Sequence, residues 1–129
     1  MKIEHIAIWA SDLEALRRFY ENRFDATAGD RYLNDRKGFS SYFLKFADGA
    51  RLELMAMPGI PPSQDNPQAQ RVDLIHLAFS VGSTEAVDQH HAQSLAEGLR
   101  VLDGPRWTGD GYYEYVLLDP EDNRIEVTI

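Results

Sequence analysis

The chain has no cysteine, which excludes disulfides, thiolate metal ligands and cysteine nucleophiles. It also has no Lys/Arg-rich run, and 13 basic against 21 acidic residues give a formal charge of −8. Nucleic acids and anionic membrane surfaces call for a basic patch, so neither is expected as a partner. No apolar stretch reaches the length of a membrane span, and the N-terminus lacks the apolar core of a signal peptide. These absences predict a cytoplasmic protein.

The remaining composition is ordinary for a small globular protein. The chain has 129 residues, of which 43% are hydrophobic and 26% are charged. That length suits one domain and is sufficient to bury a hydrophobic core without crosslinks. We therefore expect a single folded domain over residues 1–129.

Two stretches of the chain predict the same order of elements. Ser11 and Ser83 are candidate N-caps of two amphipathic helices, from Asp12 to about Asp25 and from Ser83 to near Gly98. Apolar alternation and turn signals predict a strand before each helix and three after it, at residues 1–9, 26–33, 39–46, 50–57, 73–81, 99–103, 111–118 and 123–129. The order predicts an α+β fold of two paired βαβββ modules, residues 1–57 and 72–129, joined by a proline-rich connector at 58–71.

The repeat is visible in the residues themselves. His5-Ile6-Ala7-Ile8 corresponds to residues 76–79, and Arg51-Leu52-Glu53-Leu54 corresponds to residues 124–127. His76 lies 71 positions after His5, and Glu126 lies 73 positions after Glu53, so an insertion of two residues explains the shift. Such self-similarity predicts two copies of one supersecondary unit packed together.

Two histidines and two glutamates occupy matching places in these modules. His5 and His76 lie in the opening strands, and Glu53 and Glu126 lie in the closing strands. Strand alternation puts each glutamate on the face opposite its aliphatic neighbours, so a pseudo-two-fold packing could bring all four side chains together. Two imidazoles and two carboxylates suit one divalent ion, with nickel, cobalt, zinc, manganese and ferrous iron as candidates. The same face carries Trp9, Met55 and Met57, which predicts apolar walls for a small-molecule cavity.

A structural interpretation competes with the metal site. A single histidine or glutamate on a strand more often packs or faces solvent, and an internal repeat could keep both patterns for packing alone. His90 and His91 lie in the second predicted helix, where we expect a solvated and a half-buried side chain rather than ligands. The tyrosines of the strand at 111–118 are expected to pack.

These patterns resemble the vicinal oxygen chelate superfamily, which includes glyoxalases, bleomycin-resistance proteins and extradiol dioxygenases. The resemblance covers essentially the whole chain. It rests on residues 5–13, 19–21, 76–79 and 118–126. It implies that the two modules form curved mixed sheets around a metal-binding cavity, and that the domain pairs as a homodimer.

The resemblance also implies a chemistry. His5, Glu53, His76 and Glu126 match the ligand set of bacterial glyoxalase I, whereas dioxygenases and fosfomycin enzymes typically use three ligands. The implied activity is a metal-dependent lyase or isomerase that works through a metal-chelated enediolate of a small oxygenated metabolite. Glu126, with Glu53 as its near-symmetric counterpart, would carry the proton between adjacent carbons.

One departure from the family pattern bears on the substrate. Glyoxalase I enzymes commonly hold the glutathione carboxylate with an arginine and an asparagine at the places of Trp9 and Met57. Loss of both polar groups argues against glutathione recognition. Two alternatives stay open: a ferrous extradiol-type dioxygenase or thiol/epoxide transferase on the same site, and a non-catalytic protein that sequesters a small molecule as bleomycin-resistance proteins do.

Overall fold

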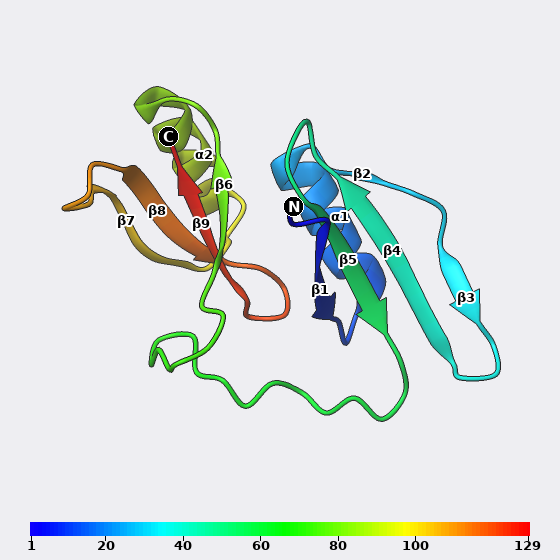
Figure 1. Cartoon of the computed structure of the whole chain (residues 1–129). Coiled ribbons are helices and arrows are strands. Elements are labelled where there is room, and N and C mark those ends of the chain that lie inside the picture. The colour runs from blue at the N-terminus through cyan, green and yellow to red at the C-terminus, as the bar shows by residue number, and fades with distance from the viewer. The chain divides into compact units, whose positions relative to one another are not determined.

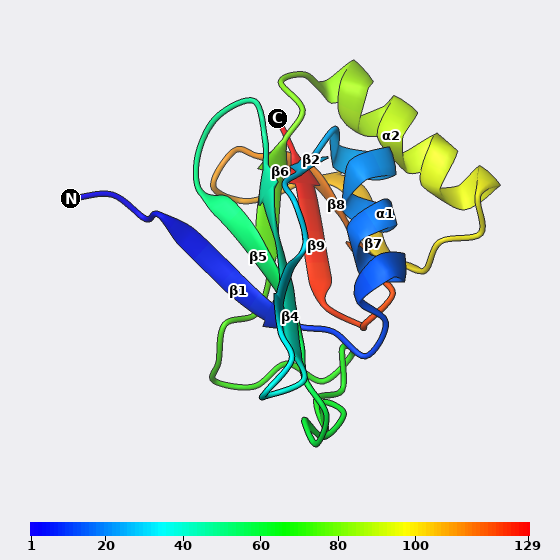
Figure 2. The same cartoon turned by 90° about the vertical axis from the view of Figure 1, so that its right-hand side faces the viewer.

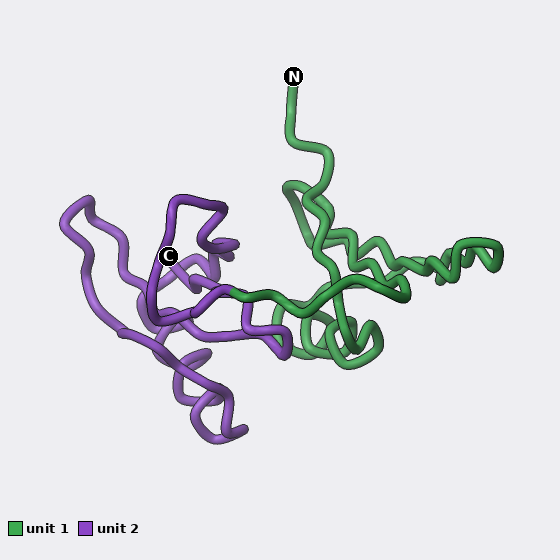
Figure 3. The backbone as a smooth tube through the Cα atoms, turned by 90° about the horizontal axis from the view of Figure 1, so that it is seen from below, with its two compact units in different colours: residues 1–64 green, residues 65–129 purple.

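A computed structural model describes residues 1–129, and the chain divides into unit 1, Met1–Gln64, and unit 2, Asp65–Ile129 (Figure 3). The boundary lies within the predicted connector. Each unit consists of one helix and one mixed sheet, which confirms the α+β class. None of the helices is long and apolar enough to cross a membrane.

Unit 1 packs one helix against a five-stranded sheet (Figure 1). Its elements are β1 (His5–Trp9), α1 (Leu13–Phe24), β2 (Thr27–Ala28), β3 (Tyr32–Asn34), β4 (Phe39–Lys45) and β5 (Arg51–Ala56). The strand order is β1-β5-β4-β2, with β3 also paired to β4, and only the β1–β5 pair is parallel. The N-terminal end of the chain points away from this sheet (Figure 2), although the Glu4 carbonyl still accepts a hydrogen bond from the Arg51 amide of β5. The core joins the apolar stripe of α1 to one sheet face through Leu13, Leu16, Tyr20, Leu44, Leu52 and Leu54.

Two predictions for unit 1 are wrong in detail. The N-cap of α1 is Asp12, whose side chain accepts a hydrogen bond from the Ala15 amide at 2.9 Å, so Ser11 lies outside the helix. Residues 26–33 form no single strand. They form two short strands, β2 and β3, which pair with separate parts of β4.

Unit 2 repeats the arrangement with four strands. Its elements are β6 (Leu77–Ser80), α2 (Thr84–Ala96), β7 (Val101–Trp107), β8 (Tyr113–Leu118) and β9 (Arg124–Thr128). The strand order is β6-β9-β8-β7, and β6 runs parallel to β9. The core lies between α2 and one face of the sheet, and its fully buried members include Val87, Tyr115, Leu117, Ile125 and Val127.

Strand β7 extends past the predicted end at residue 103 and includes Pro105. Proline is tolerated here because β7 is the edge strand of its sheet. Gly104 adopts φ +85°, and a Cβ atom there would lie 2.6 Å from the Glu114 carbonyl oxygen, so only glycine fits.

Two further predictions for unit 2 need correction. Residues 73–76 precede β6 rather than belong to it, so His76 lies just before the strand. His90 is half-buried instead of solvated, because its Nδ1 lies 2.5 Å from the Tyr115 hydroxyl.

Candidate metal centre

The parallel strand pairs of the two units have the same register. Ala7 pairs with Glu53 in unit 1, and Ala78 pairs with Glu126 in unit 2. Paired residues on neighbouring strands project from the same face, and so do residues two apart along a strand. The histidine two positions before each alanine therefore lies on the face of its glutamate. Positions that match between the two modules in the sequence therefore also have matching partners in the strand pairing.

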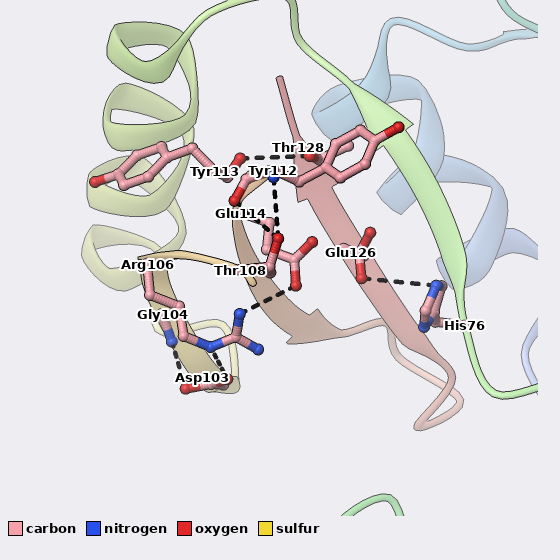
Figure 4. A network of polar contacts seen from close by, with 10 residues as sticks. All are labelled: His76, Asp103, Gly104, Arg106, Thr108, Tyr112, Tyr113, Glu114, Glu126 and Thr128. Carbon is pink, nitrogen blue, oxygen red and sulfur yellow. Dashed lines mark hydrogen bonds and ion pairs between the residues drawn. The ribbon is translucent and has the colours of Figure 1, made fainter. Parts of the chain in front are cut away.

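Within each unit the histidine faces the glutamate across a similar gap. The Nε2 atom of His5 lies 3.8 Å from Oε2 of Glu53, and that of His76 lies 3.6 Å from Oε2 of Glu126. Both histidine side chains are 38% exposed, and the glutamates are 15% and 16% exposed. Figure 4 shows His76 and Glu126 pointing toward each other. We call His5–Glu53 and His76–Glu126 the two half-sites.

The spacing in each half-site fits two ligands of one metal ion. Gaps of 3.8 Å and 3.6 Å are too long for hydrogen bonds. Imidazole nitrogens and carboxylate oxygens bind a zinc-like cation at about 2.0–2.2 Å, so two donors on one ion lie no more than about 4 Å apart. The structure holds no group of three or more His, Cys, Asp or Glu side chains placed for a metal. Since even open catalytic sites use three protein ligands, each half-site is incomplete alone, and convergence of all four residues stays a prediction.

The half-site of unit 1 has a carboxylate behind its histidine. The Nδ1–H of His5 donates to Glu4, which Arg51 also contacts. The His5 hydrogen bond, followed by Arg51, holds the pKa of Glu4 below its ordinary value. This arrangement fixes the imidazole tautomer and leaves Nε2 as the atom that faces Glu53, as outer carboxylates do for metal-bound histidines.

Phe43 forms the wall of this half-site. Its ring meets the His5 ring edge-on at 5.3 Å, and the Arg51 guanidinium lies 4.2 Å from its centroid. In the register, Phe43 pairs with Glu53 on the neighbouring strand. The His5–Glu53 pair thus has an apolar ring on one side, which limits the positions that its imidazole can adopt.

The half-site of unit 2 includes an additional carboxylate. Glu114 on β8 is buried beside Glu126, and it accepts a hydrogen bond from Nη1 of Arg106 at 3.3 Å (Figure 4). Arg106 also donates to Asp103 at 2.7 Å. Burial and the charge of Glu126 raise the pKa of Glu114 above its ordinary value, although Arg106 acts in the opposite direction. Unit 1 has Ser41 at the equivalent register position, opposite Met55 as Glu114 is opposite Thr128.

The repeated arginines bind different partners. Arg51 contacts Glu4 in unit 1, whereas Nη1 of Arg124 in unit 2 donates to the carbonyl of Pro67 at 2.6 Å. In each unit the arginine holds the segment that lies before the opening strand. In unit 1 the contacted residue is next to His5, whereas Pro67 lies nine residues before His76.

Glu4, Arg106 and Glu114 were not predicted as parts of the site. For Glu4 the available signal was its place next to His5 at the start of a strand. For Glu114 the signal was alternation: Tyr113 and Tyr115 bond to the α2 residues Asp88 and Ser94, so Glu114 projects from the other face.

Comparison with known proteins identifies the family. The Glyoxalase/Bleomycin resistance protein/Dioxygenase superfamily profile matches residues 2–127. The chain belongs to this superfamily. The uncharacterized protein YwkD of Bacillus subtilis (strain 168) is 33% identical over 110 residues, covering 82% of this chain and 84% of YwkD.

Solved structures of the glyoxalase superfamily show the same fold. A glyoxylase/bleomycin resistance protein/dioxygenase domain from Frankia sp. EAN1pec superposes with a TM-score of 0.82 at 19% identity, covering 100% of this chain and 97% of that one. The trypanothione-dependent glyoxalase I of Leishmania major gives a TM-score of 0.78 at 18% identity, covering 98% of this chain and 85% of the enzyme. At these identities the likeness establishes the fold of this glyoxalase-superfamily chain and not its reaction.

Proposed function

We propose that this protein is a divalent-metal-dependent lyase or isomerase of the glyoxalase type, acting on a small oxygenated metabolite. The observation that carries the proposal is the duplication of the half-site: two His–Glu pairs at the same register positions, with gaps of 3.8 Å and 3.6 Å. In the proposal His5, Glu53, His76 and Glu126 together hold one cation. Nickel, cobalt, zinc, manganese and ferrous iron all suit this donor set.

The equivalence of Glu53 and Glu126 favours glyoxalase-type chemistry over a three-ligand oxygenase or transferase. Each glutamate is mostly buried and faces a histidine. In a site with three ligands, Glu53 would not bind the metal, so nothing would require it to face His5 as Glu126 faces His76. This likeness supports four ligands, although it does not identify the substrate.

The reaction needs a base that reaches two adjacent carbons. A bound divalent cation supplies Lewis acidity to neighbouring substrate oxygens, which makes the attached C–H acidic. In the proposal a carboxylate oxygen of Glu126 removes that proton and returns it to the adjacent carbon. Glu53 is the counterpart in unit 1 and shares the role. His5, held by Glu4, keeps its position throughout.

Metal content of the purified protein is the first test. We expect roughly one transition-metal ion per chain, and its loss in the His5→Ala, His76→Ala and Glu126→Ala variants, because each removes one of four donors. His91→Ala is the matched control, since His91 lies on α2 against Tyr115 and should leave the metal content unchanged. A wild-type protein that takes up none of the five candidate metals would remove the enzyme proposal and leave the sequestering protein.

The proton-transfer step is tested by exchange in D2O. The metal-loaded protein is incubated with hydroxyacetone, and NMR follows deuterium incorporation and conversion to lactaldehyde. We expect Glu126→Gln to lower the rate by about a hundredfold or more, the usual contribution of a positioned base. Glu53→Gln is the matched variant that reports how far the two carboxylates share the role. Full turnover in Glu126→Gln would show that this glutamate is not the base.

A further inference from the structure

An aromatic cluster lies on the same sheet face as the His5–Glu53 half-site. The Phe39 ring meets the Trp9 ring edge-on, with 6.2 Å between centroids, and lies 6.1 Å from the Tyr32 ring. Trp9 is 39% exposed and Tyr32 is 56% exposed. Rings that contact one another and stay open offer edges and faces to another ring. We call Trp9, Phe39 and Tyr32 the aromatic cluster.

The strand register locates this cluster relative to the half-site. Trp9 pairs with Met55 on β5, and Met55 is two residues after Glu53. Two residues along a strand span about 7 Å, so the cluster begins within the length of a small molecule from the Glu53 carboxylate. Across the sheet the same row continues from Met55 through Ser41 to Tyr32.

No charged side chain belongs to this row. Arg31, next to Tyr32 in the chain, turns to the helix side of the sheet, where it donates to Ser40 at 3.1 Å and contacts Glu14 at 3.8 Å. Together with Phe39, two residues before Ser41 on β4, this row presents Trp9, Met55 and Tyr32 as an apolar surface, and the Ser41 side chain between them is buried. This composition suits a flat apolar group rather than an anion.

The repeat shows that folding does not require aromatic residues here. In unit 2 the equivalent row consists of Ser80, which pairs with Thr128, and Glu114, which pairs with Thr128 from the other side. The same module therefore folds with hydroxyl and carboxyl groups where unit 1 has Trp9, Met55 and Ser41. Packing within the module does not account for an exposed tryptophan in one copy and a serine in the other.

We infer that the aromatic cluster is a subsite for a planar apolar ring of the substrate, whose neighbouring oxygens reach the His5–Glu53 half-site. The substrate class is accordingly a small metabolite with adjacent oxygens on one end and an aromatic ring on the other. This inference rests on the proposed function, because it assumes that the adjacent oxygens of the substrate bind at the half-site.

The test compares two acids that share adjacent oxygens and differ by one ring. Lactate and 3-phenyllactate are titrated into the whole protein, with and without nickel, by calorimetry and by tryptophan emission. Since the chain has two tryptophans, Trp107→Phe leaves Trp9 as the only reporter. We expect 3-phenyllactate to bind about tenfold or more tightly than lactate and to shift the Trp9 emission.

The decisive variant introduces the residue of unit 2, Ser80, at the equivalent position of unit 1. Trp9→Ser should reduce the affinity for 3-phenyllactate to that for lactate and leave lactate binding unchanged. Tyr32→Ser, at an exposed position on a short strand, is the second variant should Trp9→Ser fail to fold, and it should lower the preference several-fold. Trp107→Ser is the control, because Trp107 packs on Tyr113 at the α2 side of unit 2 and should keep the full preference.

Several results would overturn the subsite. They are equal affinity for both acids, no binding of 3-phenyllactate at any concentration, or a preference that survives Trp9→Ser and Tyr32→Ser. A Trp9 emission that shifts with protein concentration alone would show that a second copy of the chain covers the cluster, which also overturns it. Failure of the metal proposal is distinct: no cation is bound, yet the ring preference persists in nickel-free protein.

Discussion

Tyr42 connects the sheet of unit 1 to its helix through one hydrogen bond. Its hydroxyl donates to Oε1 of Glu14 at 2.8 Å, and Arg17 donates to the other carboxylate oxygen at 2.9 Å. The Tyr42 bond is the largest cause of a pKa of Glu14 below its ordinary value, and the same bond raises the pKa of Tyr42. The ionised carboxylate of Glu14 on α1 therefore ties the helix to Tyr42 of β4.

Tyr42→Phe should destabilise the protein in a pH-dependent way. A carboxyl group with a lowered pKa in the folded state stabilises it above its unfolded pKa, and that contribution is lost as pH falls through the folded pKa. We expect the variant to lose roughly 0.5–1 kcal/mol of unfolding free energy at pH 7, because Glu14 is partly exposed, and less at pH 3. Urea unfolding at both pH values measures this, with the exposed Tyr112→Phe as control. An equal loss at both pH values would contradict the role of ionised Glu14.

The residues of the two half-sites could be predicted because a histidine and a glutamate occur at matching positions in both modules. Glu114 could not be predicted in this way, since its counterpart is Ser41 and the repeat therefore hides it. Glu4 was missed for another reason. Neighbouring residues on a strand project to opposite faces, so alternation separates Glu4 from His5, whereas the two side chains meet at the start of β1.

Helix starts show how local hydrogen bonds determine the ends of an element. Asp12 and Ser83 occupy the N-caps of α1 and α2, and their side chains accept amide hydrogen bonds from Ala15 and Ala86. Each cap lies just after the opening strand of its unit. The cap therefore fixes where the chain turns from the half-site strand into the helix that covers the other face.

Alanine substitutions should distinguish Asp12 from Ser11 as the N-cap of α1. We expect Asp12→Ala to lower the unfolding free energy by about 1 kcal/mol, because it leaves an amide of the first turn without its acceptor. Ser83→Ala should cost a similar amount in α2. Ser11→Ala is the control and should cost less than Asp12→Ala, because the Asp12 side chain is the one that accepts the Ala15 amide. Thermal and urea unfolding measure all three, and a larger loss in Ser11→Ala than in Asp12→Ala would contradict the observed cap.

Most elements were predictable because periodicity and turn residues agree within them. The exceptions lie at sheet edges. Residues 26–33 alternate like one strand, yet β2 and β3 are two short strands that pair with separate parts of β4. At an edge of the unit 2 sheet, Pro105 suggests the end of a strand, but an edge strand needs hydrogen bonds on one side only, so β7 continues to Trp107.

The two units are joined by the longest stretch without helix or regular strand. Between β5 and β6 the chain is almost entirely exposed, and its contacts include one isolated bridge between Asn66 and Ala69 and the hydrogen bond from Arg124 to Pro67. Long exposed backbone of this kind is the preferred substrate of proteases. The sequence predicted this connector from its prolines and its lack of apolar period.

Brief trypsin treatment should therefore cleave first after Arg71. The expected products are residues 1–71 and 72–129, identified by mass spectrometry. Arg71→Gln should slow the first cleavage several-fold, because it removes the basic residue in the exposed segment. Lys37→Gln is the control, since Lys37 lies in a short turn closed by a hydrogen bond to Asn34 and should be cut later. First cleavage within α1 or β4 would contradict this picture of the connector.

Sequence repetition predicted two similar modules, and the structure supports that expectation down to the pairing of Ala7 with Glu53 and of Ala78 with Glu126. Joint action of four ligands is not predictable from either module, because each supplies only two donors. The expected homodimer likewise stays a prediction, which sedimentation of the metal-loaded protein would measure.

On β5 and β9, the residue that faces the histidine and the residue two positions later lie in separate rows of the same sheet face, which has a consequence for evolution. Glu53 and Glu126 occupy one row in each unit, while Met55 and Thr128, two residues later, occupy the next. Mutations in the second row can alter which molecule is accepted without moving a donor atom in the first. The two modules can therefore differ in specificity while both keep their His–Glu pairs. A scaffold with this separation is a favourable starting point for new substrates, whether selected in nature or in the laboratory.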